Sequence, residues 1–70
     1  MSKFKPKQIR LIDILGIMND NDMVVVMFKN QSKTTHSNYV RVIRTILDEY
    51  LGCTVEGIIG GGGLTVLIND

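Results

Sequence analysis

Cysteine and histidine are nearly absent from this chain of 70 residues, which holds one of each. A lone Cys53 has no partner for an internal disulfide, and Cys53 with His36 cannot complete the four-ligand set of a structural zinc site. Small domains commonly offset a small core with disulfides, a metal or oligomerisation. Because the first two are excluded, the sequence favours self-association, and we expect no metal and no cofactor.

The chain also lacks a long hydrophobic run and an excess of charge of either sign. Its longest apolar run is far shorter than the roughly 18 residues that predict a membrane span. Residues 1–7 show no apolar segment typical of a secretory signal. The formal net charge is +1, which neither recruits nor excludes nucleic acid. These absences predict a cytoplasmic protein that does not bind membranes, with Cys53 as a free thiol.

The most informative feature that is present is six consecutive apolar residues, Met23–Phe28. Successive side chains on a strand point to opposite faces, so both faces of this strand require burial. One face would carry Val24, Val26 and Phe28, and the other Met23, Val25 and Met27. A domain of this size can cover one face of a sheet and leaves the other open. We therefore expect a homo-oligomer whose interface contains Met23, Val25 and Met27.

Apolar residues spaced three and four apart predict two helices. A short helix covers about 11–18, and Asn19–Asp22 ends it because Asn and Asp favour turns. A longer amphipathic helix covers about 38–51, with Ser37 or Asn38 as its N-terminal cap. Its apolar stripe comprises Tyr39, Val42, Ile43, Ile46, Leu47, Tyr50 and Leu51.

Four extended segments complete the predicted fold. The first strand covers 23–29, and a polar strand at 33–35 returns beside it at the edge of the sheet. Strands at 53–59 and 64–68 form a hairpin around Gly60–Gly63. The sequence thus predicts an α+β fold: a small, mainly antiparallel sheet with the helix 38–51 packed on one face and a short N-terminal helix. Residues 1–7 are a basic flexible lead-in to a single domain, 8–70.

No residue pattern indicates catalysis or cofactor binding. Gly60–Gly63 is followed by a strand and lacks the lysine and the helix of a phosphate-binding loop. Asn19–Asp22 lacks the glycine and the glutamate that complete a calcium-binding loop. His36 has no sequence neighbour to act with it as a general base, although folding could bring Asp13 or Glu56 close. We therefore predict no catalytic, cofactor-binding or metal-binding residues, and no enzyme.

A cluster of basic residues supports an alternative function. A short basic arm with an aromatic residue, here Phe4, can neutralise phosphates and stack on a base. Asp48 and Glu49 lie on the same predicted helix as Arg41 and Arg44, and their negative charges argue against nucleic-acid binding. The possible nucleic-acid contacts are Lys3, Lys5, Lys7, Arg10, Arg41 and Arg44.

The order of these segments resembles a loose group of small proteins from bacteriophages and bacterial mobile elements. The segments that match their outline are Leu11–Leu15, Asn19–Asp22, Met23–Phe28, Tyr39–Leu51 and Gly62–Ile68. The resemblance implies a non-enzymatic accessory protein that binds a larger protein partner, and it assigns no site residues. The sequence therefore predicts an interaction and oligomerisation module, with nucleic-acid binding through the basic arm as the alternative.

Overall fold

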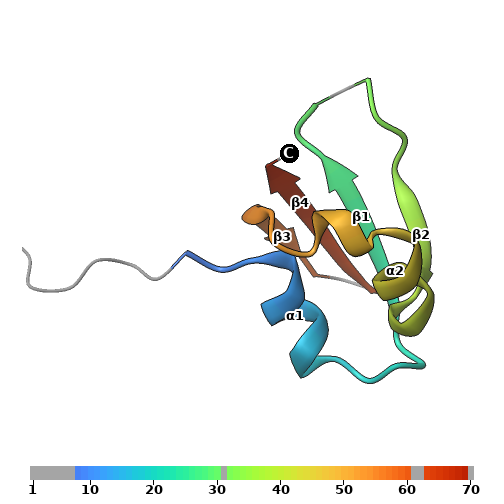
Figure 1. Ribbon diagram of the computed structural model, residues 1–70. Coiled ribbons are helices and arrows are strands. Elements are labelled where there is room, and N and C mark those ends of the chain that lie inside the picture. The colour runs from blue at the N-terminus through green and yellow to red at the C-terminus, as the bar shows by residue number, and fades with distance from the viewer. Residues whose placement is uncertain (1–7, 31, 61–62, 70) are drawn as a thin grey trace, which may run out of the picture.

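The structure, a computed structural model, describes residues 8–30, 32–60 and 63–69. These residues form two α-helices, one 3-10 helix and one four-stranded sheet, in which the helices lie on a single face (Figure 1). The expected α+β class is confirmed. In chain order the elements are α1 (Leu11–Ile17), β1 (Met23–Phe28), β2 (His36–Tyr39), α2 (Val40–Ile46), the 3-10 helix η1 (Asp48–Tyr50), β3 (Thr54–Ile59) and β4 (Leu64–Asn69).

The sheet is mixed and has the strand order β2-β1-β4-β3. The outer pairs, β1 with β2 and β3 with β4, are antiparallel, whereas the central pair of β1 and β4 is parallel. Parallel neighbours require a crossover connection. Here α2 and η1 cross over between the two hairpins, so that β4 returns beside β1 in the same direction. The expectation of a mainly antiparallel sheet missed this central parallel pair.

The hydrophobic core lies between the helices and the inner face of the sheet. Alternate residues of β1 and β4 point into it, as the period of two in a strand requires. Side chains from α1, α2 and Leu47 close it from the other side. The eleven buried residues of this core are Leu11, Ile14, Leu15, Val24, Val26, Phe28, Val40, Ile43, Leu47, Val66 and Ile68.

The expected long helix over 38–51 is wrong. Asn38 and Tyr39 belong to β2, and α2 is a seven-residue helix that ends before Leu47, whose φ of −110° and ψ of 29° leave the helical region. The short η1 follows. This break keeps Leu47 buried and brings the ring of Tyr50 to 5.0 Å from the ring of Phe28. The predicted apolar stripe is therefore only partly correct, because Tyr39 and Ile46 are exposed whereas Val40, which it left out, is buried.

The predicted side-chain cap at Ser37 or Asn38 is also absent. Tyr39 occupies the N-cap of α2 without a side-chain hydrogen bond. Backbone carbonyls of the preceding loop accept from the first helical turn instead. The Asp22 carbonyl accepts from the Val40 amide at 2.9 Å, and the Asp20 carbonyl accepts from the Arg41 amide at 3.2 Å. The free amides of the first helical turn therefore find partners in the loop that ends α1.

At the other helix, α1 begins after Arg10, whose amide donates to the Asp13 carboxylate at 3.0 Å. The helix lies within the predicted 11–18 and has seven residues, as α2 does. The expected contrast between one long helix and one short helix is therefore wrong.

The polar return strand lies later in the chain than predicted. We expected it at 33–35, but β2 comprises His36–Tyr39, with Val26 opposite His36 and Met23 opposite Tyr39. Lys33 is held in the preceding loop, where its ammonium donates to the Tyr50 hydroxyl at 3.0 Å and lies 4.7 Å from the centre of that ring. The expected position of this strand at a sheet edge is confirmed.

The burial contrast within α1 predicts the effect of two matched truncations. Leu15 is 0% exposed and Ile17 is 83% exposed. Leu15→Ala should lower the free energy of unfolding by about 2–5 kcal/mol, because it removes buried methyl groups and leaves a cavity. Ile17→Ala should change it by less than about 0.5 kcal/mol. Urea denaturation followed by circular dichroism measures both values, and equal losses would contradict the placement of α1.

Candidate interaction surface

No described helix or strand covers the second face of the sheet (Figure 1). The strand register identifies the side chains on it, because residues directly opposite one another on paired strands share a face. Val25 lies opposite Ser37 on β2 and beside Thr65 on β4, while Met27 lies beside Leu67. We call this surface the open face. Its members are Met23, Val25, Met27, Ser37, Tyr39, Thr54, Gly57, Ile59, Thr65, Leu67 and Asn69.

The open face carries six apolar side chains together with the polar residues Ser37, Thr54, Thr65 and Asn69. Its large members Met23, Met27, Tyr39 and Ile59 are between 41% and 67% exposed, and Val25 and Leu67 are half-buried. None of these members is Asp, Glu, Lys or Arg, but Arg10 lies opposite Thr54 and therefore shares the face at its β3 side. On the inner face, by contrast, Val24, Val26, Val66 and Ile68 are fully buried. Contiguous exposed apolar surface of this kind is typical of a site for association.

All three residues predicted for the oligomer interface, Met23, Val25 and Met27, lie on the open face. Sequence reasoning missed Tyr39 and Leu67 as members of the same surface. The alternation of residues 64–69 places Leu67 on the opposite face of the strand from Val66 and Ile68, and this signal could have identified Leu67 as an outward-facing residue. The signal could not show that β4 pairs with β1, because that parallel pairing joins segments distant in the chain.

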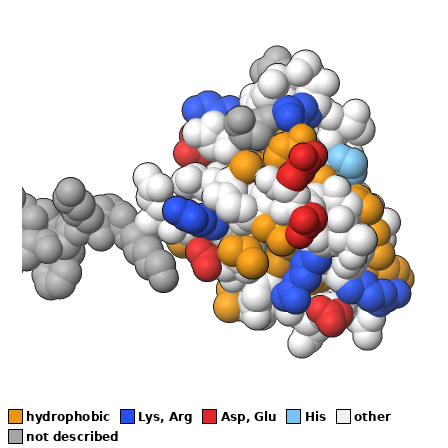
Figure 2. Space-filling view, in the orientation of Figure 1, with side chains coloured by type: hydrophobic (Ala, Val, Ile, Leu, Met, Phe, Trp, Pro, Cys, Tyr) orange, Lys and Arg blue, Asp and Glu red, His pale blue; other side chains and the backbone are white. Residues whose placement is uncertain are grey.

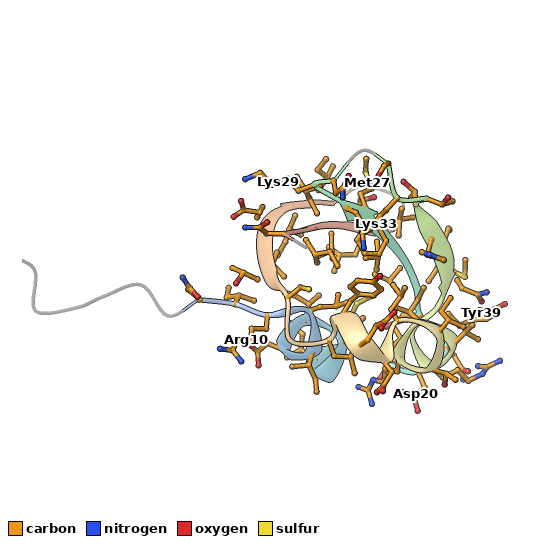
Figure 3. All side chains as sticks on the ribbon, turned by 45° about the horizontal axis from the view of Figure 1, so that its top comes forward. Arg10, Asp20, Met27, Lys29, Lys33 and Tyr39 are labelled. Atoms are coloured by element: carbon orange, nitrogen blue, oxygen red, sulfur yellow. The ribbon has the colours of Figure 1, made fainter. Side chains whose placement is uncertain are left out.

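A cation lies beside one end of the open face. Tyr39 lies opposite Met23 at the start of β1, and Met27 lies near the other end of that strand (Figure 3). The Arg41 guanidinium lies 4.9 Å from the centre of the Tyr39 ring and also donates to the Asn21 side chain. Stacking of a guanidinium on an aromatic ring restricts both groups. Tyr39 is therefore a positioned aromatic side chain at this end of the open face.

The residues proposed for nucleic-acid contact are only partly described, because Lys3, Lys5 and Lys7 lie outside the described residues. Of the others, Arg10 lies at the start of α1, and the Arg41 backbone bonds to Asp20 in the loop after α1 (Figure 3). The Arg44 guanidinium donates to the Leu15 carbonyl at 2.9 Å.

Basic and acidic side chains are interleaved on the helical face of the molecule (Figure 2). Arg41 and Arg44 also have partners within the chain, the Asn21 side chain and the Leu15 carbonyl. A binding surface for nucleic acid needs basic residues clustered on one face. The described basic residues therefore do not form the concentrated positive surface that the alternative function requires.

The residues considered for chemistry lie apart from one another in the structure or bond to other groups. The ring of His36 lies 6.0 Å from the ring of Phe28 in an edge arrangement. The carboxylates considered as its partners are engaged elsewhere, since Asp13 bonds to the Arg10 amide and Glu56 pairs with Lys29 at 3.0 Å. Cys53 is half-buried. Across residues 8–30, 32–60 and 63–69, no three His, Cys, Asp or Glu side chains gather as metal ligands.

No family model matches this chain, and no curated protein and no solved structure matches it. Within the described part of the chain, no helix is long and apolar enough to cross a membrane.

The internal partners of Arg41 and Arg44 predict a small role in any nucleic-acid binding. We expect the double change Arg41→Ala and Arg44→Ala to leave the affinity for a labelled single-stranded oligonucleotide within about threefold at low salt. An arginine that did bind phosphate would contribute to both the affinity and its salt dependence. Fluorescence anisotropy over a salt series measures both quantities. A tenfold or greater decrease in affinity, with a shallower salt dependence in the variant, would support the nucleic-acid alternative.

Proposed function

We propose that this protein is a non-enzymatic self-association module in which the open faces of two copies pack against each other. The observation that carries the proposal is the one-sided cover of the sheet, with helices over one face and exposed apolar side chains such as Met23, Met27 and Tyr39 on the other. Two sheets stacked through their open faces form a sandwich in which the sheets lie about 10 Å apart. The dimer would then have four layers, with the helices outermost.

The chemistry of the open face suits a second copy of the same chain. A twofold dimer brings the same surface of each copy together, so the surface must complement itself. Its six apolar side chains can be buried without a charge among them, and an unpaired buried charge is the costliest defect of an interface. Arg10 beside Thr54 and Arg41 beside Tyr39 would have to stay at the solvated margin. Met23 and Met27 have flexible thioether side chains that adapt to a facing surface. A face with charges of one sign would instead require a partner of opposite charge.

The size of the molecule supports the same proposal. A standard interface buries about 800 Å² on each partner. The molecule exposes 5083 Å², so about one sixth of this surface would be needed, a share that one broad face of a small domain can supply. Among the described residues, the core inside one copy comprises eleven buried side chains. Association would add the second apolar layer that a small domain needs for stability.

In this proposal the helical layers remain exposed and are available to a larger protein partner. The resemblance to accessory proteins of bacteriophages and mobile elements supports a role of that kind. Ile12, Ile17 and Ile46 provide exposed apolar side chains on α1 and α2. The proposed assembly would present two copies of this layer, related by the twofold axis.

A charge placed on the open face should disrupt the dimer. We expect the full chain to have the mass of a dimer at both low and high salt, because apolar association is not screened by ions. Met27→Lys should weaken association by tenfold or more, since it would bury an unpaired ammonium at the interface. Light scattering over a dilution series measures the mass and the dissociation constant.

Ile46→Lys is the matched control, because Ile46 on α2 and Met27 are exposed to a similar extent. This change should leave the dissociation constant within twofold. Circular dichroism establishes that both variants remain folded. A monomeric parent protein, or a Met27→Lys variant that stays dimeric, would contradict the proposal.

A further inference from the structure

The outer edge of β3 already accepts an extended segment of the chain itself. β3 is the last strand of the sheet, and the residues before α1 pair antiparallel with its first part through a bridge between Arg10 and Thr54. The Leu11 amide donates to the Cys53 carbonyl at 2.9 Å, and the Val55 amide donates to the Ile9 carbonyl at 2.7 Å. These bonds show that this edge can form a ladder with an incoming strand.

No described residue pairs with the remainder of this edge, Glu56–Ile59. Among the described residues, no strand pairs with its outer side beyond the bridge at Thr54. A shallow groove of about 470 Å³ runs along it, and Ile58 and Ile59 are exposed beside it. An unpaired strand edge presents a row of free amide and carbonyl groups that can bind another strand. The residues that line the groove are Gln8, Ile9, Thr54, Val55, Glu56, Gly57 and Ile58.

Proteins usually protect such an edge with lysine, proline, a short strand or a bulge. β3 has a bulge between Val55 and Gly57, but its six residues include no lysine and no proline. Its only charged residue, Glu56, is paired with Lys29 at 3.0 Å. The opposite edge of the sheet, β2, is only four residues long and mostly polar. The two edges therefore differ, and the β3 edge is the more receptive one.

We propose that the outer edge of β3 at Glu56–Ile59 is a strand-addition site for an extended segment of a protein partner. The bound segment would run antiparallel to β3, in the direction of the Ile9–Leu11 segment. Apolar β-branched side chains at alternate positions would contact Ile9 and Ile58 at the rim of the groove. Neutral or basic residues would lie near Glu56, which is the charged member of the described lining.

A single extended segment fits this edge better than a second folded copy does. The β3 strand of a second copy would arrive with its own Ile9–Leu11 segment and α1 beside it. Only four residues would be free for pairing on either side. A partner segment carries no such flanking structure and needs only backbone groups along the edge. Gly57 and Ile59 belong to both the open face and this edge. The inference still does not require the dimer, because an added strand bonds to backbone groups in the plane of the sheet, whereas the open face presents side chains perpendicular to it.

The test uses the full chain and an acetylated seven-residue peptide of alternating valine and threonine with a lysine at each end. Titration followed by amide NMR spectra should show saturable shifts that are largest at Glu56–Ile59. Two N-methylated forms of the peptide distinguish strand pairing from apolar adhesion, because a strand donates to a sheet from one edge only. Methylation of one alternate set of amides should abolish the shifts, and methylation of the other set should not.

Several results would overturn the inference. These are the absence of saturable shifts, shifts centred on Met23, Val25 and Met27, or equal binding of the two methylated peptides. Nuclear Overhauser contacts from residues 3–7 to Ile58 within the free protein would also overturn it, because the edge would then be filled by the chain itself.

A pair of variants adds a second readout. Ile58 is 46% exposed and Ile46 is 49% exposed. Ile58→Lys should weaken peptide binding by fivefold or more, and Ile46→Lys should leave it within twofold. Light scattering on the same samples separates the two proposals. Loss of peptide binding with an intact dimer would affect only the edge site. Loss of the dimer with intact peptide binding would affect only the association through the open face. Equal peptide binding by both variants would contradict the edge site.

Discussion

The rest of the structure depends on one constraint, which is that β1 has apolar side chains to bury on both of its faces. This strand has a neighbour on each side and apolar residues on each face. Its inner residues Val24, Val26 and Phe28 are buried beneath the helices. Its outer residues receive no cover from any described helix. The helical layer on one side and the apolar surface on the other both follow from six consecutive apolar residues.

The parallel pairing of β1 with β4 transmits this constraint to the second half of the chain. It places Val66 beside Val26 and Leu67 beside Met27, so both faces of the sheet continue across the centre. The same pairing leaves β3 at the end of the sheet, where its outer edge is only partly occupied. The parallel pairing of β1 with β4 thus determines both the extent of the open face and the position of the β3 edge.

Local patterns in the sequence predicted the elements that local interactions determine. The apolar run 23–28 and the two β-rich runs around Gly60–Gly63 located β1, β3 and β4. The period of two in a strand placed Met23, Val25 and Met27 opposite the buried residues. The break at Leu47 was not predictable, because it depends on the packing of Tyr50 against Phe28. The position of β2 depends on its long-range register with β1 and on the contacts of Lys33. The parallel pairing that brings Leu67 onto the open face leaves no local signal either.

The most direct test of the account is whether the open faces of two copies touch. A sample mixed from protein with labelled methionine methyl groups and unlabelled protein reports contacts between copies through isotope-filtered Overhauser spectra. The account predicts contacts from the methyl groups of Met23 and Met27 to Val25, Tyr39 or Leu67 of another copy. Contacts between copies that involve only the helical layer, such as those of Ile12 or Ile46, or no contacts between copies at all, would contradict it.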